Sequence, residues 1–248
     1  MSGLQVEYGE DRAVLTLDRP ASRNAIDADM VASLHEVCGR LEAAPVPLII
    51  TGGTEIFAAG ADIAQLRERR NTDALAGINS GVFSRIAALP MPTVAAIAGY
   101  ALGGGAELAY ACDFRIGTPT TRLGNPEGRL GILAAAGAAW RLAELVGEPL
   151  AKEILLAGRT LTAEEALDVR LLNEVVEAEE LLATAHAWVD RTLRSAPLAL
   201  RLTKLALAMP RGAHPAFDNV AQAVLFETEE KHRRMSDFLG RRQRSATA

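Results

Sequence analysis

The feature that most constrains the fold is a run without any charged side chain, which extends from Ile86 to Ala106. Its length satisfies the simplest criterion for a membrane-spanning helix. However, prolines at 90 and 92 and glycines at 99 and 103–105 interrupt it. Within the run, "PTVAAIAG" has the pattern of a buried strand that leads into a turn. We therefore expect a strand, a loop and a helix start inside a globular protein, with no membrane association.

The run ends in "GYALGGGAELAYACD", residues 99–113, where three glycines precede Glu107. Glycine weakens a helix and an unpaired buried charge is costly, so two local rules are broken together. A helix that begins near Gly103 would present unpaired N–H groups, and glycines let a ligand oxygen approach them closely. Glu107 would then lie on the same side as Gly104, one turn further on. Such a site could polarise a carbonyl beside a carboxylate. Alternatively, the glycines permit close helix packing and Glu107 pairs with a distant arginine.

Two further stretches have comparable features. "IFAAGADIAQL", residues 56–66, also leads from a strand and loop into a helix, with Gly60 and Ala61 at the turn. Two such turns could each supply one backbone N–H to a single oxygen and form an oxyanion hole. In "LGNPEGRLGI", residues 123–132, Glu127 follows Pro126, whose fixed torsion could aim the carboxylate from a loop. The alternative for Glu127 is a surface position in a polar turn.

The rest of the chain alternates between strand and helix patterns. We predict strands over 4–8, 13–18, 46–53, 93–99 and 113–118, and helices over 27–44, 62–70 and 74–89, with mostly helix from residue 134 onward. This order predicts an α/β core followed by a helical C-terminal part. A chain of 248 residues can hold one large domain with a helical appendage. We place the boundary near Arg191.

Composition and the remaining polar residues exclude several classes of function. A net charge of -5 gives no electrostatic footprint for nucleic acid, and the basic cluster near the C-terminus fits a solvated helix face, although an anionic ligand group could use it. The two cysteines and four histidines lack the spacing of a disulfide framework or a metal site. Neither GxSxG nor GxxxxGK occurs. The N-terminal "MSGLQVEYGED" has no apolar signal region, so we expect a cytoplasmic protein.

The motifs together resemble the enoyl-CoA hydratase/isomerase family, the crotonase superfamily. The resemblance rests on "LDRPASRNAID", "FAAGADI", "GYALGGGAELAYACD" and "LGNPEGRLGI", and extends through "AGRTLTAEEALDVRLLNEVV" and "FETEEKHRRMSDFLGRR". It implies an α/β, crotonase-like spiral of repeated β-β-α units over residues 1–190. It also implies a helical oligomerisation region over 191–248, with homotrimers that often pair into hexamers.

The resemblance further implies the roles of individual residues. The backbone N–H groups of Ala61 and Gly104 would form an oxyanion hole for the thioester carbonyl of an acyl-CoA substrate. Glu107 would hold and deprotonate a water molecule, and Glu127 would protonate the substrate Cα. No metal and no cofactor are implied. The CoA-binding surface would consist of Arg23, Ala25, Ala59, Asp62 and Ile63.

The leading hypothesis is a hydro-lyase that adds water to trans-2-enoyl-CoA to give 3-hydroxyacyl-CoA, in fatty-acid or related acyl-CoA metabolism. The alternatives are another reaction on the same fold (double-bond isomerisation, decarboxylation or thioester hydrolysis) and a non-catalytic acyl-CoA binder. They arise because Gly128, Arg129 and "AAAGAAW", residues 134–140, depart from the family pattern after Glu127. We expect Trp140 to add bulk near the pocket wall. Arg170 stands where the family commonly has a glycine, and a left-handed cap there would cost about 1 kcal/mol.

Overall fold

The computed structural model describes residues 3–246. Over residues 243–246 it describes the backbone alone. Contacts within the chain divide it into two units, one that ends at Val189 and one that begins at Asp190. The helix α9 (Leu181–Leu193) contains this boundary. The two units are described separately below.

A six-stranded sheet forms the centre of the first unit. Its order is β1 (Leu4–Tyr8), β2 (Ala13–Leu17), β3 (Leu48–Thr51), β4 (Thr93–Ile97), β6 (Phe114–Gly117) and β9 (Glu174–Val175). β1 and β2 form an antiparallel hairpin, and all further neighbours are parallel. β3 and β4 are buried throughout, which explains why their sequences are apolar without alternation. The five strands predicted from the sequence are confirmed.

A second, three-stranded sheet consists of β5 (Tyr100–Leu102), β7 (Arg122–Gly124) and β8 (Thr160–Thr162). The chain passes from β4 to β5 through Gly99, whose φ is 58°. A Cβ at Gly99 would lie 2.1 Å from the backbone oxygen of Glu55, so a larger residue has no room there. The helix α5 (Gly104–Ala111) follows β5 directly. The uncharged run is therefore a strand, a turn, a short strand and a helix start, as predicted in outline.

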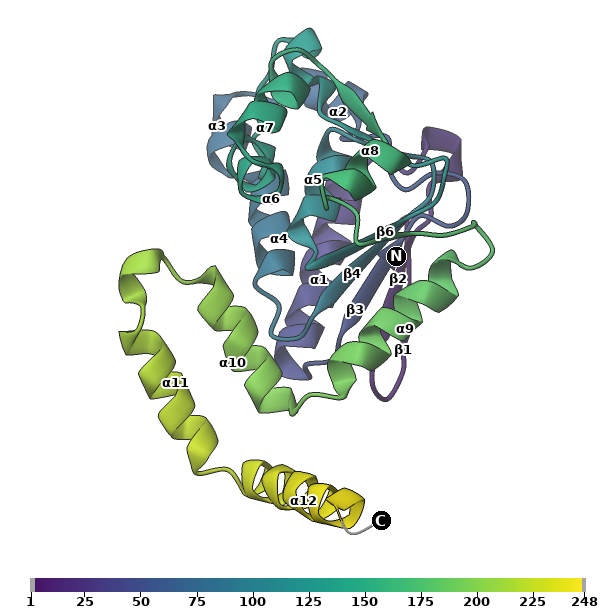
Figure 1. Cartoon of the computed structure of the whole chain (residues 1–248). Helices are drawn as coiled ribbons and strands as arrows, with labels where there is room; N and C mark the ends of the chain where they lie inside the picture. The colour runs from purple at the N-terminus through teal and green to yellow at the C-terminus, as the bar shows by residue number, and fades with distance from the viewer. Residues whose placement is uncertain (1–2, 247–248) are drawn as a thin grey trace. The chain divides into compact units, whose positions relative to one another are not determined.

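Helices pack beside the parallel strands (Figure 1). α1 (Ala28–Ala43) begins at Asp27, whose carboxylate accepts a hydrogen bond of 2.8 Å from the backbone of Met30. α1 contacts α4 (Ile78–Ala87), and α4 contacts α5. The other helices of this unit are α2 (Ile63–Glu68), α3 (Asn71–Leu75), α6 (Ala143–Val146), α7 (Glu148–Leu155) and α8 (Ala163–Asp168).

The prediction of one helix over residues 74–89 is wrong. α3 ends at Leu75 and α4 begins at Ile78, because Gly77 adopts a φ of 63° between them. A left-handed residue cannot continue a right-handed helix, and glycine adopts this conformation at little cost. The break gives the chain a new direction at the start of α4.

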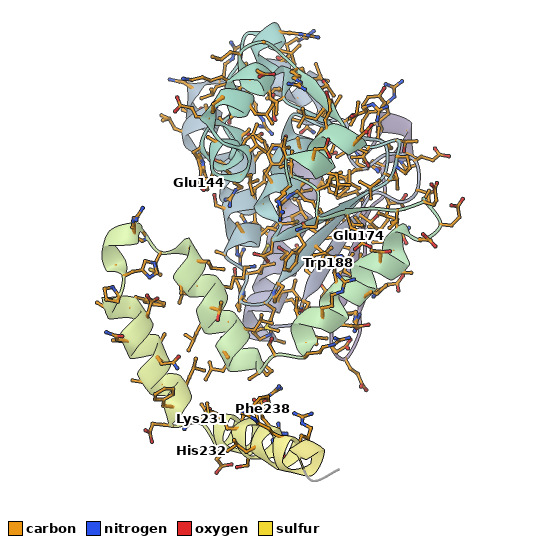
Figure 2. All side chains as sticks on the ribbon, in the orientation of Figure 1. Glu144, Glu174, Trp188, Lys231, His232 and Phe238 are labelled. Atoms are coloured by element: carbon orange, nitrogen blue, oxygen red, sulfur yellow. The ribbon has the colours of Figure 1, made fainter. Side chains whose placement is uncertain are left out.

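Polar side chains connect α5 and α9 to the rest of the first unit. Arg115 is buried, and its guanidinium donates to the backbone oxygens of Cys112 at 2.6 Å and Leu171 at 2.7 Å, which closes the C-terminal end of α5. Further along the chain, the indole N–H of Trp188 in α9 donates to Glu174 at 2.8 Å (Figure 2). These contacts fix α5 and α9 to the parallel sheet.

The second unit is helical, with α10 (Pro197–Ala208), α11 (Ala216–Phe226) and α12 (Glu229–Ala246). Large apolar side chains are exposed on all three helices: Leu205, Leu207, Val220, Val224, Phe226, Met235, Phe238 and Leu239. Within residues 3–246, none of the helices combines the length and the apolar character that crossing a bilayer requires. An α/β core followed by helices agrees with the predicted fold class.

Candidate active site

The three consecutive glycines allow the start of α5 to lie against two other segments. Gly103 adopts a φ of 51°, and a Cβ there would lie 2.9 Å from Oε1 of Glu127. A Cβ at Gly105 would lie 2.3 Å from the backbone oxygen of Ala58. Side chains at these positions would therefore collide with Glu127 on one side and with the Ala58 segment on the other. This close approach explains why glycines occur at these positions, a question that the sequence alone did not decide.

Two unpaired backbone donors lie next to each other at this helix start. α5 begins at Gly104, and a Cβ on Gly104 would lie 3.4 Å from the backbone nitrogen of Ala61. Within the described part of the chain, neither the Ala61 nor the Gly104 N–H donates a hydrogen bond. Both residues line the same pocket. An oxygen atom that gains negative charge would be stabilised there by two N–H groups and the helix dipole.

The Ala61 donor is held in place by a neighbouring loop. Backbone hydrogen bonds join Ala59 to Arg23 at 3.0 Å, Ile26 to Gly60 at 2.8 Å and Asp62 to Ile26 at 3.0 Å. The two stretches that contain the predicted CoA-binding residues therefore run side by side.

The five predicted CoA-binding residues differ in where their side chains lie. Ala59 and Ile63 line the pocket, whereas Arg23, Ala25 and Asp62 do not. The Asp62 carboxylate accepts from the backbone of Ala64 at 3.1 Å and so caps α2. The Arg23 side chain is exposed. Their part in CoA binding stays a prediction.

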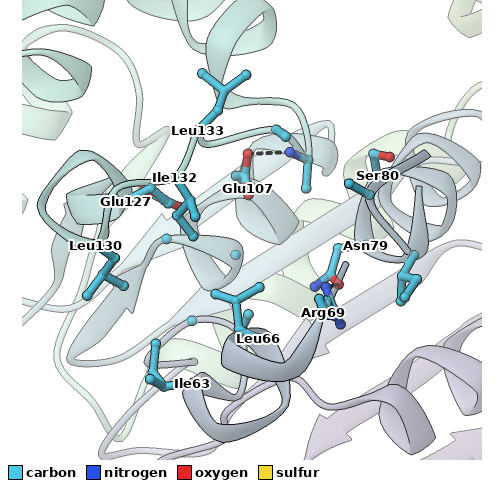
Figure 3. A pocket seen from close by; sticks show the side chains of 18 of the residues that line it. Ile63, Leu66, Arg69, Asn79, Ser80, Glu107, Glu127, Leu130, Ile132 and Leu133 are labelled. Carbon is cyan, nitrogen blue, oxygen red and sulfur yellow. Dashed lines mark hydrogen bonds between the residues drawn. The ribbon is translucent and has the colours of Figure 1, made fainter. Parts of the chain in front are cut away.

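The pocket has a volume of about 470 Å³ and lies between α2, α4, the start of α5 and the loop after Glu127 (Figure 3). Its lining is apolar at Ile63, Leu66, Ile78, Leu130, Ile132 and Leu133 and polar at Arg69, Arg70, Asp73, Asn79, Ser80, Glu107 and Glu127. The residues proposed for chemistry thus share one cavity with several that the sequence analysis did not assign. Such a mostly apolar cavity with a few convergent polar groups is typical of a small-molecule site.

Glu107 is a buried carboxyl held by the opposite wall. It is 3% exposed, and its Oε1 accepts hydrogen bonds from the backbone N–H of Ala136 at 2.7 Å and of Ala138 at 3.1 Å. Burial is the largest cause that raises the pKa of Glu107 to about 7, with a smaller rise from the charge of Glu127 and an opposing effect of the two N–H groups already included. Among the described residues, its Oε2 has no partner and can bind a ligand in the pocket. The alternative of an ion pair between Glu107 and a distant arginine is wrong.

Glu127 is the second buried carboxyl, so the alternative of a surface residue is wrong. It is 8% exposed; its Oε1 lies 3.4 Å from the amide nitrogen of Asn125, and its buried Oε2 has no hydrogen-bond partner among residues 3–246. The Asn125 oxygen accepts from the hydroxyl of Tyr110 at 3.2 Å. Burial raises the pKa of Glu127. The raised pKa favours the protonated form of this carboxyl, which lines the same cavity as Glu107.

The wall after Glu127 differs from the prediction. Trp140 does not line the pocket; its ring lies 4.2 Å from the guanidinium carbon of Arg141 and the residue is half exposed. Ala135 and Ala136 line the wall instead, because this loop directs N–H groups towards Glu107 and presents backbone and small side chains to the cavity. The unusual alanine-rich segment thus holds a carboxyl.

No group of three or more His, Cys, Asp or Glu side chains that could hold a metal ion occurs within the described residues. Both cysteines, Cys38 and Cys112, are buried, and they form no disulfide. The cavity brings two backbone donors and two carboxyls together. This combination defines a site for reactions in which a carbonyl oxygen gains charge while protons move at neighbouring atoms.

The comparisons with known proteins agree with that class. The family model of enoyl-CoA hydratase/isomerase matches residues 9–244. A short-chain-enoyl-CoA hydratase of Clostridium acetobutylicum is 36% identical over 93% of this chain and 92% of its own length. A 2,3-dehydroadipyl-CoA hydratase of Escherichia coli is 35% identical over 98% of this chain and 97% of its own length. The crystal structure of an enoyl-CoA hydratase from Bacillus anthracis superposes with a TM-score of 0.90 at 28% identity, covering 97% of each chain.

The chain belongs to the enoyl-CoA hydratase/isomerase family. Its fold is the crotonase fold of the family's solved structures. The predicted family and fold class are confirmed. The roles of the individual site residues are not tested by these comparisons and are taken up as a proposal below.

Proposed function

We propose that this chain is an enoyl-CoA hydratase, which adds water to a trans-2-enoyl-CoA and releases a 3-hydroxyacyl-CoA. The observation that carries the proposal is the pair of buried carboxyls, Glu107 and Glu127, beside two unpaired backbone donors in one cavity. Hydration needs one group to accept a proton from water and one to deliver a proton to Cα. The family and the hydratases among its similar members support this reaction.

The thioester carbonyl is the group that the two backbone donors bind. Addition at Cβ pushes electrons through the double bond onto this oxygen, so an enolate forms before Cα is protonated. Hydrogen bonds from Ala61 and Gly104 stabilise that oxygen more than the carbonyl of the substrate, and each is worth about 3–4 kcal/mol in a dry site. Because both donors are backbone groups, they are held ready before the substrate arrives.

The two carboxyls divide the proton transfers. Glu107 holds water through Oε2 and takes its proton as the oxygen bonds to Cβ. A pKa of about 7 makes a substantial share of Glu107 ionised at neutral pH and keeps it basic enough for this task. Glu127 delivers its proton to Cα. The product gains one hydroxyl and one hydrogen, and exchange with solvent resets both carboxyls.

An isomerase of the same fold is the second candidate. Moving a double bond requires a proton to leave one carbon and return to another, and a single carboxyl can serve both steps. The burial of both carboxyls, each with one oxygen left without a partner in the described structure, favours hydration. The backbone contacts between the alanine-rich wall and Glu107 argue against a non-catalytic binder.

The proposal includes the binding surface and the assembly. The CoA moiety lies along Arg23, Ala25, Ala59, Asp62 and Ile63, and acyl-CoA is the substrate without a metal or cofactor. The chain assembles in the cytoplasm as a homotrimer or a hexamer through residues 191–248. The exposed apolar side chains of α10 to α12 support this role, because surfaces of this kind mark protein contacts.

The test follows the absorbance of the conjugated enoyl thioester with purified protein and a panel of trans-2-enoyl-CoA substrates. We expect loss of absorbance, 3-hydroxyacyl-CoA as the product by mass spectrometry, and collapse of the rate in Glu127→Gln. Glu7→Gln serves as the control, because Glu7 is an exposed glutamate in β1. Unchanged absorbance with bound substrate would exclude hydration, and an isomerised product would favour the second candidate.

A further inference from the structure

One end of the cavity is polar in a way that hydration itself does not require. The cavity extends from Ile63 and Leu130 past Leu66 to Arg69 and Asn79, which lie side by side (Figure 3). None of the proposed proton transfers uses Arg69 or Asn79. If the thioester oxygen lies at Ala61 and Gly104 and the CoA leaves past Ile63, this polar end receives the acyl chain. The inference that follows therefore rests on the proposed function.

The orientation of the Asn79 amide is fixed by Arg69. A guanidinium nitrogen of Arg69 lies 2.9 Å from the side-chain oxygen of Asn79. Because a guanidinium has donors and no acceptor, Asn79 must turn its oxygen to Arg69 and its NH₂ group away. That nitrogen lies 3.8 Å from the point that a Cβ on Gly104 would occupy. The Asn79 amide therefore links Arg69 to the start of α5.

Apart from the hydrogen bond that joins them, the side chains of Arg69 and Asn79 have no hydrogen-bond partner among the described residues. Asn79 is 9% exposed, and within the described residues nothing accepts a hydrogen bond from its NH₂ group. In the same part of the chain, Arg69 has no carboxylate within ion-pair distance. Asn79 therefore lines the cavity with a donor that no described residue uses, and a ligand in the cavity can supply the acceptor.

The charges around this end favour an anion. Arg69 and Arg70 both line it, and one carboxylate, Asp73, lines it with them. The Asp73 carboxylate accepts a hydrogen bond of 2.8 Å from the backbone N–H of Arg70, at the start of α3. A hydrocarbon tail would strip water from Arg69 and Asn79 and return no hydrogen bond. A carboxylate would accept from both groups, and guanidinium suits its geometry.

We propose that the cavity selects enoyl-CoA thioesters whose acyl chain carries a terminal carboxylate, with Arg69 as the residue that binds this carboxylate and Asn79 as a second donor. The acyl chain is short, because a single asparagine side chain spans the interval between Arg69 and the donors at the start of α5. Arg69 is then a specificity-determining residue. It recognises the far end of the chain and leaves the chemistry at Cα and Cβ unchanged.

The experiment compares trans-2,3-dehydroadipyl-CoA with trans-2-hexenoyl-CoA, which share chain length and double bond and differ in the terminal carboxylate. The wild type should have the higher kcat/KM for the dicarboxylic substrate. Arg69→Met should lower that value about 10- to 100-fold, the usual range for a hydrogen-bonded charge, and leave hexenoyl-CoA within about threefold. Arg69→Lys should restore part of the preference. Arg67→Met is the control, since Arg67 lies two residues earlier, in α2, with a side chain that is 84% exposed.

Two outcomes of these rates would overturn the proposal. Equal kcat/KM for both substrates in the wild type would show that the polar end selects nothing. An equal loss for both substrates in Arg69→Met would show that Arg69 binds the CoA portion that they share.

Binding of the saturated adipyl-CoA and hexanoyl-CoA, measured by calorimetry, separates this proposal from the proposed function. Tighter binding of adipyl-CoA that is lost in Arg69→Met supports the carboxylate site even if no enoyl-CoA is hydrated, in which case the hydratase assignment alone fails. Hydration of hexenoyl-CoA with no preference in either rate or binding leaves the hydratase assignment intact and overturns the carboxylate site.

Discussion

The two sides of the cavity are built by different means. The side proposed to face the thioester oxygen is backbone, where Gly103 adopts a φ of 51° and a side chain at Gly105 would collide with the backbone of Ala58. The groups assigned to proton transfer and specificity are side chains, Glu107, Glu127, Arg69 and Asn79, each held by few contacts. Backbone donors cannot be exchanged without moving the fold, whereas side chains can be exchanged singly. The difference separates a fixed part of the reaction from parts that set proton transfer and specificity.

The largest effect is expected on the carboxyl side. Glu107→Gln keeps an oxygen that can accept from Ala136 and Ala138 but removes the base. We expect kcat for enoyl-CoA hydration to fall about 10²- to 10⁴-fold, with KM changed little. Steady-state kinetics checks this, and a variant that retains more than a tenth of the wild-type kcat would remove Glu107 from the proton transfers.

A somewhat smaller effect is expected on the backbone side. Gly104→Ala adds a Cβ that would lie 3.4 Å from the Ala61 nitrogen, beside the place of the thioester oxygen. Gly104 has no positive φ, so alanine fits the helix and the stability should not fall. We expect kcat to decrease about 10²- to 10³-fold with an unchanged unfolding transition. Full activity in this variant would mean that the oxygen binds elsewhere.

Burial of Glu107 should also be visible in the stability of the protein. Its pKa of about 7 lies above the ordinary value of 4.5, so the folded state holds the proton more tightly than the unfolded state. The free energy of unfolding therefore falls as the pH rises from about 4.5 to about 7, by about 3 kcal/mol from this residue, and then levels off.

Urea unfolding at pH 5 and pH 8 gives the change in the free energy of unfolding between the two pH values. The contribution of Glu107 is the difference in this change between the wild type and Glu107→Gln. The variant should gain about 3 kcal/mol over the wild type on going from the lower to the higher pH. The same pH dependence in both proteins would show that the folded state does not hold Glu107 in its neutral form.

The smallest effect lies outside the cavity. Arg170 adopts a φ of 59°, the left-handed conformation that the sequence comparison with the family predicts. Arg170→Gly should stabilise the protein by about 1 kcal/mol without changing kcat, whereas Arg170→Ala should give no gain because alanine has the same penalty. Thermal unfolding of the two variants distinguishes them, and an equal shift in both would contradict a backbone origin.

Local sequence patterns were sufficient to predict five strands and the position of α5, because apolar runs, prolines and glycines act over short distances. They missed the short strands β5, β7, β8 and β9, and the last two lie where we predicted mostly helix. The motifs also indicated Ala61, Gly104, Glu107 and Glu127, and the structure brings all four to one cavity. Their chemical roles remain predictions.

Other parts of the site depend on contacts that no local pattern records. The N–H groups of Ala136 and Ala138 hold a carboxyl 29 and 31 positions earlier in the chain. Asn79 was hidden inside a predicted continuous helix, and the break at Gly77 precedes the helix that carries it. Asn125 had a weak signal, because it stands directly before the proline that positions Glu127. The prediction that Trp140 adds bulk near the pocket wall was wrong, because the size of a side chain does not determine the direction in which its loop presents it.

The measurement that tests the central claim most directly is hydration of a trans-2-enoyl-CoA in D₂O, with the product analysed by NMR. Two carboxyls that act together with the backbone donors predict one deuterium at Cα and an oxygen-bearing carbon at Cβ in each product molecule, and no product from Glu127→Gln. Recovery of an enoyl-CoA with a displaced double bond, or equal deuterium incorporation and hydration by Glu127→Gln, would contradict the account.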